Sequence, residues 1–224
     1  MTLGTRPLGR RRTLAAAAGA TVCAGLAGWP GIRAPAATLA AEATPFGVQW
    51  LRDRVRELAS RPFEPPTIEL PAVLSDLTYD QYRDIRFRGD HALWRDLGLT
   101  FQVQFFHPGF YHREPVQLFE VADGTARALQ YDPALFDYGK TGIDPKTLSP
   151  AIGFAGFRLH YPLNRPDYLD EAAVFLGASY FRCVGRGNGY GISARGLAVN
   201  TALPEGEEFP AFRSFWLERP RPGA

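Results

Sequence analysis

The stretch Phe101-Gln102-Val103-Gln104-Phe105 alternates apolar and polar side chains without a break. Successive side chains of an extended strand point to opposite faces of its sheet, so this period of two predicts a strand with one buried face. The two glutamines would then lie on the other, polar face. From this stretch onward we expect the chain to fold as β-sheet.

Further stretches with strand character follow at short intervals. Residues 116–121 and 125–131 flank the turn sequence Ala122-Asp123-Gly124 and predict a hairpin. The other predicted strands, each bounded by Gly, Pro or Asn, are residues 157–161, 173–176, 180–184, 197–201 and 213–217. Short strands without intervening helices predict an all-β protein, an antiparallel β-sandwich or barrel.

Helical patterns are confined to the region before these strands. Residues 46–60 predict one helix, because apolar side chains recur on one face with charged residues between them. The apolar positions are Val48, Leu51, Val55 and Leu58. A short helical turn is expected at residues 78–82, with Thr78 as its cap.

Composition supports an ordered protein with many turns. The chain has 224 residues, of which 46% are hydrophobic and 21% charged, and it contains 23 Gly and 19 Pro. The net charge of +2 is unevenly distributed, because five arginines and no acidic residue precede Glu42, leaving 20 basic against 23 acidic residues after them. The basic balance therefore gives no argument for a nucleic-acid partner.

The basic N-terminal segment has the order of a secretory signal. Three arginines at residues 10–12 precede the uncharged residues 13–32, and small residues follow at 34–36 and 41–43. Adjacent arginines at such a start suggest the twin-arginine route. We expect residues 1–43 to be an export signal, cleaved near the end of that range.

A membrane anchor is the alternative for residues 13–32, which are long enough to span a bilayer. Seven alanines, four glycines and Pro30 make them only weakly apolar, which favours a cleavable signal. A lipoprotein is not expected, because Val22 precedes Cys23 where a lipobox has a small residue.

Cleavage near residue 43 leaves Cys183 as the one cysteine of the mature chain. No intramolecular disulfide is then possible, so stability must come from an apolar core. The neighbours Phe181 and Val184 predict that Cys183 is a small buried hydrophobe.

Residues 176–198 are rich in glycine, aromatic side chains and arginine. Gly189, Gly191 and Ala194 have the spacing of a dinucleotide-binding fingerprint, but that motif requires a following helix, and the sequence after Arg195-Gly196 predicts strands. We therefore expect no nucleotide and no other cofactor.

The same segment has groups suited to a sugar, because aromatic faces pack on C–H groups and planar donors bind hydroxyls. The candidate substrate-binding residues are Tyr190 and Arg195, with Arg186 and Asn188 behind them. The alternative is a glycine-rich turn between strands whose arginines are merely solvated.

Two further patterns argue against simple catalytic or metal sites. Pro108 and Gly109 lie between His107 and His112 and exclude a helical ligand pair, so no metal site is expected. The adjacent carboxylates of Glu207-Glu208 would point to opposite faces of an extended chain, which makes them a poor acid–base pair.

Several longer motifs occur in one co-linear order from Phe46 onward. They are residues 153–157, 161–162, 177–182, 190–198, 201–204, 206–210 and 215–220. Together they resemble the periplasmic glucan biosynthesis proteins, the G and D types of the osmoregulated periplasmic glucan pathway. The twin-arginine start is similar to the D type in particular.

This resemblance implies a β-sandwich like the supersandwich of galactose mutarotases, followed by a small immunoglobulin-like domain, with a long cleft for β-1,2-linked glucan. Residues 44–224 would be the front part of the sandwich, and the immunoglobulin-like domain would be absent. For the D type, the resemblance implies an endo-acting β-1,2-glucanase with an acid and a base carboxylate. It places these carboxylates beyond residue 224, so the catalytic residues are unassigned and the present chain is expected to be inactive.

The leading hypothesis is a periplasmic protein of glucan biosynthesis that acts on the β-1,2-glucan backbone and is glucanase-like at full length. A non-catalytic glucan-binding scaffold of the same pathway is the alternative. A third possibility is a structural β-sandwich that binds partner proteins. The expected partner is a β-glucan polysaccharide, with no nucleic acid and with membrane contact only during export.

Overall fold

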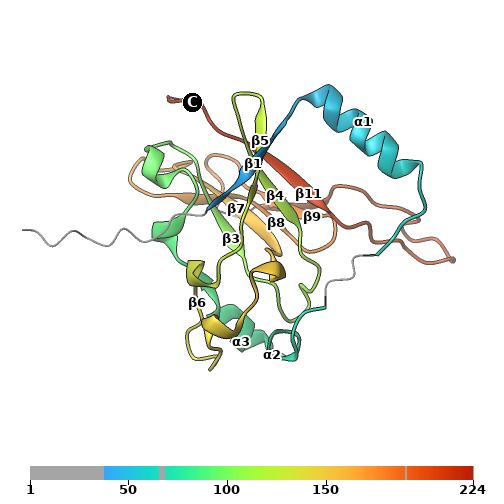
Figure 1. The fold of residues 1–224 in the computed structure, drawn as a ribbon, viewed down its shortest axis with the longest axis horizontal. Coiled ribbons are helices and arrows are strands. Elements are labelled where there is room, and N and C mark those ends of the chain that lie inside the picture. The colour runs from blue at the N-terminus through green and yellow to red at the C-terminus, as the bar shows by residue number, and fades with distance from the viewer. Residues whose placement is uncertain (1–37, 66–68, 190, 224) are drawn as a thin grey trace, which may run out of the picture. The chain divides into compact units, whose positions relative to one another are not determined.

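The computed structural model describes residues 38–65, 69–189 and 191–223, and strands dominate them (Figure 1). Within these residues, one open sheet has the strand order β1-β5-β4-β11 and a second has the order β10-β9-β8-β7-β3. The first comprises β1 (Leu39–Pro45), β4 (Gln117–Ala122), β5 (Thr125–Leu129) and β11 (Ser214–Glu218). The second comprises β3 (Gln102–Phe106), β7 (Gly156–Tyr161), β8 (Asp170–Leu176), β9 (Tyr180–Cys183) and β10 (Ile192–Arg195). The short strands β2 (Arg86–Phe87) and β6 (Phe136–Asp137) pair separately.

Helices are few in the described residues. They are α1 (Val48–Ala59), α2 (Ala72–Ser75) and α3 (Tyr79–Asp84). Thr78 caps α3 as predicted: its side chain accepts a hydrogen bond from Gln81 N (3.3 Å), and Thr78 N donates to Gln81 Oε1 (2.9 Å). Short 3₁₀ helices cover Gly89–His91, Arg95–Leu97, Pro133–Leu135, Pro145–Thr147 and Pro150–Ile152.

The core lies where the inner faces of the two sheets meet. Val103 and Phe105 are fully buried on β3, which confirms the alternation of apolar and polar side chains in this strand. Phe215 of β11 packs edge-on against Phe157 and Phe175 of the other sheet, with ring centroids 5.0 and 5.4 Å apart. The fold is therefore all-β and sandwich-like, as the spacing of the strands predicts.

The hairpin β4–β5 forms at the predicted turn. Asp123 and Gly124 have φ values of 51° and 70°, both in the left-handed region. Two consecutive residues with positive φ match the right-handed twist of the flanking strands, which is why Asp-Gly sequences favour such turns. The hairpin register then pairs Ala122 with Thr125.

Two strand predictions are corrected by the structure. β11 runs parallel to β4, pairing Ser214 with Gln117 and Glu218 with Val121, whereas the sequence pattern predicted antiparallel neighbours only. Parallel partners need a long crossover, and here the second sheet supplies it. Residues 197–201 form no strand, because Asn200 has φ 55° and the chain turns there.

Cys183 is exposed, which contradicts its interpretation as a buried hydrophobe. It ends β9 and pairs with Ala173 and with Ile192, which is itself 83% exposed. Phe181, two residues earlier, stacks on Phe175 at 5.6 Å. The apolar face is therefore packed up to Phe181, while the end of the strand reaches solvent.

The first strand was missed from sequence, since residues 39–43 fell within the range predicted as export signal. They form most of β1, which pairs antiparallel with β5. The uncharged residues 13–32 lie outside the described residues. No helix in the described part of the chain has the length and apolarity needed to cross a membrane.

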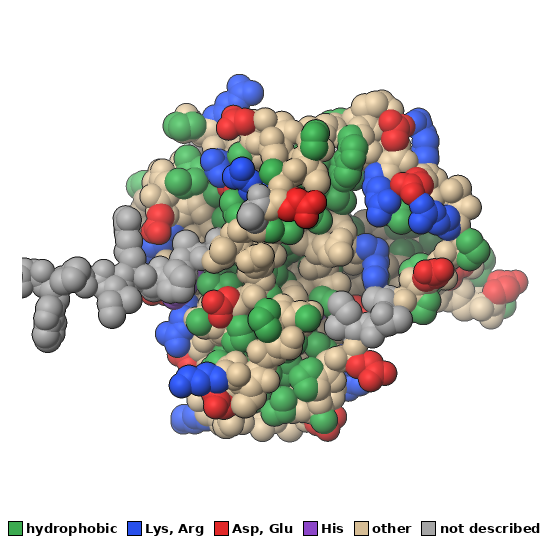
Figure 2. Space-filling view, viewed as in Figure 1, with side chains coloured by type: hydrophobic (Ala, Val, Ile, Leu, Met, Phe, Trp, Pro, Cys, Tyr) green, Lys and Arg blue, Asp and Glu red, His purple; other side chains and the backbone are tan. Residues whose placement is uncertain are grey.

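Helix α1 forms as predicted, but none of its residues is buried. Val48, Val55 and Leu58 are each more than half exposed, so its apolar stripe is not covered by the described residues. On its other side Arg54 pairs with Glu57 and Arg56 with Asp53, at 3.0 and 2.8 Å. Basic and acidic side chains are likewise interspersed over the face shown in Figure 2.

Candidate functional site

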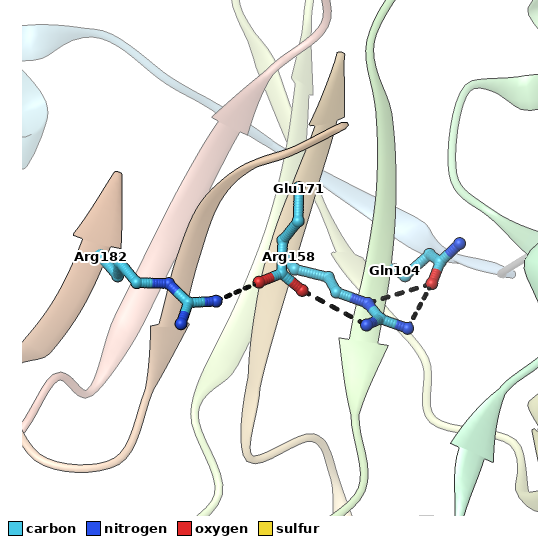
Figure 3. Close-up of polar contacts among 4 residues, drawn as sticks. All are labelled: Gln104, Arg158, Glu171 and Arg182. Carbon is cyan, nitrogen blue, oxygen red and sulfur yellow. Dashed lines mark hydrogen bonds and ion pairs between the residues drawn. The ribbon is translucent and has the colours of Figure 1, made fainter. Parts of the chain in front are cut away.

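Four polar side chains form a row across the outer face of the five-stranded sheet (Figure 3). This polar row consists of Gln104 on β3, Arg158 on β7, Glu171 on β8 and Arg182 on β9. Because side chains alternate along each strand, Gln104 and Arg158 lie on the other face of the sheet from the buried Phe105 and Phe157. The row therefore lies on the solvent side of the sheet, directly behind the core.

A β-bulge brings Glu171 into the row. The register of β8 pairs Ala173 with Leu159 but Glu171 with His160, so Ala172 is an extra residue in β8. One extra residue reverses which side chains face outward. Glu171 consequently faces the same side as Arg158, where strict alternation from Ala173 would have turned it toward the core.

Hydrogen bonds connect the whole row. Arg158 donates to Gln104 Oε1 from Nε (3.1 Å) and Nη2 (2.7 Å), and to Glu171 Oε2 from Nη1 (3.3 Å). Arg182 Nη2 donates to Glu171 Oε1 at 2.5 Å. Both carboxylate oxygens are thus held by guanidinium groups, which fixes Glu171 between the two arginines.

The row is partly shielded from water. The side chains of Arg158 and Glu171 are 29% and 27% exposed, and that of Arg182 is 39% exposed. The Arg158 guanidinium also lies 5.6 Å from the ring centroid of Phe106. Two arginines and one glutamate leave this surface with one net positive charge and a set of planar groups held in fixed orientations.

His160 lies beside the row on β7. Its Nε2 is buried and has no hydrogen-bond partner among the described residues. Burial, together with the positive charge of Arg158, lowers the pKa of His160. The ring is therefore neutral at pH 7, and a neutral imidazole can accept or donate one hydrogen bond at that nitrogen.

Loops at one end of the sheet are tied together by Asp170 and Asn164. Asp170 Oδ2 accepts from the backbone N–H groups of Leu163 (3.2 Å) and Asn164 (3.0 Å). Asn164 Oδ1 in turn accepts from Gly187 N at 2.7 Å. The loop after β9 is consequently held against the loop between β7 and β8.

Of the predicted sugar-binding residues that the structure describes, Arg186 and Asn188 lie at this end of the sheet and Arg195 does not, so they do not form one cluster. Arg186 and Asn188 are exposed in the loop before β10, whereas Arg195 is the last residue of β10, about 10 Å further along the strand. Tyr190 lies outside the described residues. Arg195 pairs with Glu207, and its guanidinium lies 5.3 Å from the ring centroid of Phe209.

The two histidines considered as metal ligands have other surroundings. His107 is buried, and its Nε2 lies 2.7 Å from Tyr131 Oη and 3.0 Å from Tyr138 Oη. His112 packs on the Tyr82 ring, with centroids 5.5 Å apart. In the described part of the chain no three His, Cys, Asp or Glu side chains are grouped to hold a metal ion.

Sequence reasoning missed the polar row. A signal was present in each strand, since Gln104, Arg158 and Arg182 each lie between apolar neighbours. Alternation within a strand identifies a polar face, but it does not say which strands are neighbours. No local sequence pattern marks the bulge that turns Glu171 outward.

These observations define a class: an all-β, sandwich-like protein with a row of planar polar groups across one outer sheet face. The family model described as "Periplasmic glucan biosynthesis protein, MdoG" matches residues 46–224. The chain belongs to this family.

Curated relatives agree with the family model. The chain is 53% identical over 179 residues to "Glucans biosynthesis protein G" of Ralstonia nicotianae and 51% identical over 206 residues to the protein of that name in Rhodopseudomonas palustris. It is 51% identical over 175 residues to "Glucans biosynthesis protein D" of Xylella fastidiosa. The matches cover 80%, 91% and 78% of this chain but 35%, 40% and 32% of the relatives. The chain therefore spans about a third of their length, and the identities do not separate the G from the D type.

Proposed function

We propose that this chain takes part in periplasmic glucan biosynthesis by binding the β-1,2-glucan backbone along the polar row. Family membership supports the pathway and the periplasmic location, because the description of the family names both. The names of the relatives also refer to glucan biosynthesis. The polar row is the observation that supports binding of a saccharide by this part of the protein.

The chemistry of the row suits a polyhydroxylated ligand. Each sugar hydroxyl both donates and accepts, and the row has guanidinium donors beside the carboxylate oxygens of Glu171. Mutual hydrogen bonds already orient these side chains, so less side-chain entropy is lost on binding. From β3 to β9 the row crosses three strand spacings, about 14 Å, which suits an extended chain better than a single sugar.

Hydrolysis of the glucan remains the further prediction for the full-length protein. The described residues support it less directly than they support binding, because the carboxylate in the row is held between two arginines. General acid–base hydrolysis needs two carboxyl groups across a cleft, about 5–9.5 Å apart. The polar row has one.

Calorimetric titration of the full chain with linear β-1,2-gluco-oligosaccharides tests the proposal. Arg158→Met and Arg182→Met each remove charged hydrogen-bond donors, and we expect each to weaken binding about 10- to 100-fold. Arg54→Met is the matched control, since Arg54 pairs with Glu57 on α1 and lies outside the row. Its affinity should equal that of the unmodified chain.

The same samples distinguish the alternatives. Oligosaccharides that become shorter during long incubation would favour hydrolysis, whereas binding with unchanged ligand length favours the scaffold. No heat of binding to β-1,2-glucan would contradict the proposal and favour a role in binding proteins. If Arg54→Met lost as much affinity as the two variants in the polar row, the row would have no special role in binding.

A further inference from the structure

Strand β1 pairs with β5 at both of its ends, with an irregularity between Leu39 and Ala43. The register joins Leu39 to Leu129 and, after a shift, Ala43 to Arg127 and Thr44 to Ala126. Before the strand, Gln130 N donates to the carbonyl of Thr38 at 2.9 Å. The sheet therefore includes the chain from Thr38 onward.

The strand also connects to the core and to α1. Leu39 packs against the core cluster, and Phe46 N donates to Gly124 O at 2.8 Å. The Phe46 ring stacks on Trp216 of β11, with centroids 5.9 Å apart. Through these contacts β1 covers the edge of β5 and leads the chain onto the outer face of the four-stranded sheet.

The sequence has two groups of small residues at which a signal peptidase would be expected to cut. One is Ala34-Pro35-Ala36 and the other is Ala41-Glu42-Ala43, each with alanine at the first and third positions before the bond. A cut after Ala43 would remove five of the seven residues of β1. A cut after Ala36 would leave the strand whole.

Pairing in a sheet also protects a bond from proteolysis. Backbone that is hydrogen-bonded to a neighbouring strand cannot lie extended in a protease at the same time, and cleavage concentrates in segments without such pairing. Ala43 and Thr44 are both paired with β5. Removal of β1 would also expose β5 as a new, unprotected sheet edge.

We propose that the export signal is cut between Ala36 and Ala37, so that the exported chain begins directly before β1 and keeps the whole strand. This inference rests on the periplasmic location in the proposed function. It replaces the expected cut near residue 43 with one that is seven residues earlier.

Intact-mass measurement of the chain, tagged at its C-terminus and recovered from the periplasm of a Gram-negative host, tests this assignment. The expected mass is that of residues 37–224. Ala36→Leu places a bulky side chain directly before the proposed bond, and we expect loss of cleavage there with accumulation of the uncut chain. Ala43→Leu is the matched control at an exposed side chain of β1, and it should be cut like the unmodified chain.

Other outcomes would overturn the assignment. A product that begins at Thr44, or loss of cleavage in Ala43→Leu, would place the cut in β1. Normal cleavage of Ala36→Leu would also contradict it. A chain that never reaches the periplasm would overturn the proposed location itself, whereas a periplasmic chain with another N-terminus would overturn only the cleavage site.

Discussion

Glu120 on β4 and Arg219 directly after β11 form a two-point ion pair between the parallel strands. Arg219 Nε lies 2.8 Å from Glu120 Oε1, and its Nη2 lies 2.9 Å from Oε2. Trp94 Nε1 also donates to Oε1, at 2.7 Å. Glu120 is 3% exposed, so all of its partners come from the protein and the pair fixes the end of β11 on β4.

Substitution Arg219→Met should destabilise the fold. Among the described residues it leaves the buried Glu120 carboxylate with Trp94 as its one remaining side-chain donor, and we expect a loss of about 2–3 kcal/mol in the free energy of unfolding. Urea unfolding measures this loss in the free energy of unfolding. Arg213→Met, which removes an exposed ion pair to Glu114 just before the same strand, should cost less than about 1 kcal/mol. Equal losses would contradict a special role for the buried pair.

Stability should fall as the pH drops below neutrality. Burial lowers the pKa of His107 from 6.5 to about 4, so between these values the unfolded chain binds a proton that the folded chain does not. The His107 contribution is complete above about pH 6.5 and is lost as the pH falls toward 4, by about 3 kcal/mol. The pKa values of His112 and His160 are lowered too and act in the same direction.

Urea midpoints measured from pH 7 to pH 4 test this dependence. His107→Gln should be less stable at pH 7 but should lose less stability on acidification. Tyr138→Phe keeps His107 buried and should retain the pH dependence, although it removes a hydroxyl beside His107 Nε2. The same pH dependence in His107→Gln as in the unmodified chain would show that other groups cause it.

Gly156→Ala should disrupt the five-stranded sheet at the start of β7. A Cβ at this position would clash with the carbonyl oxygen of Phe175 on β8, so the strands would have to separate. We expect a loss of about 1–3 kcal/mol, measured as a lower unfolding midpoint. In Gly89→Ala the new Cβ meets its nearest atom at 3.5 Å, an ordinary contact, and stability should change by less than about 0.5 kcal/mol.

Cys183 should react with a maleimide reagent in the folded protein, because its side chain is exposed at the end of β9. Peptide mass mapping after labelling under native conditions identifies the modified residue and separates it from Cys23. We expect the rate at Cys183 to change little when urea is added below the unfolding transition. Labelling only after unfolding would restore the buried interpretation.

Much of the fold was predictable from local pattern. The alternation at Val103 and Phe105, the Asp123-Gly124 turn and the Thr78 cap each depend on neighbours in sequence, and each forms as predicted. Strand β1, which the sequence did not predict, depends instead on a segment that is distant in sequence. Its alanines and Thr44 give no apolar alternation, so pairing with β5 decides its structure.

The candidate site was less predictable. Sequence proximity drew attention to Arg186, Asn188, Tyr190 and Arg195, yet Arg195 is engaged with Glu207 and Phe209. Arg158 donates to Gln104 across adjacent strands, although the two residues lie 54 positions apart in sequence. Contacts of this kind depend on sheet order, which no local pattern specifies.

By itself, the sequence determined the all-β class, the family, and which side of each strand is polar, because periodicity and co-linear motifs are properties of neighbouring residues. Only the tertiary structure decided that β11 runs parallel to β4, that a bulge turns Glu171 outward and that Cys183 reaches solvent. These features follow from the register between strands, and register is set by packing between segments far apart along the chain.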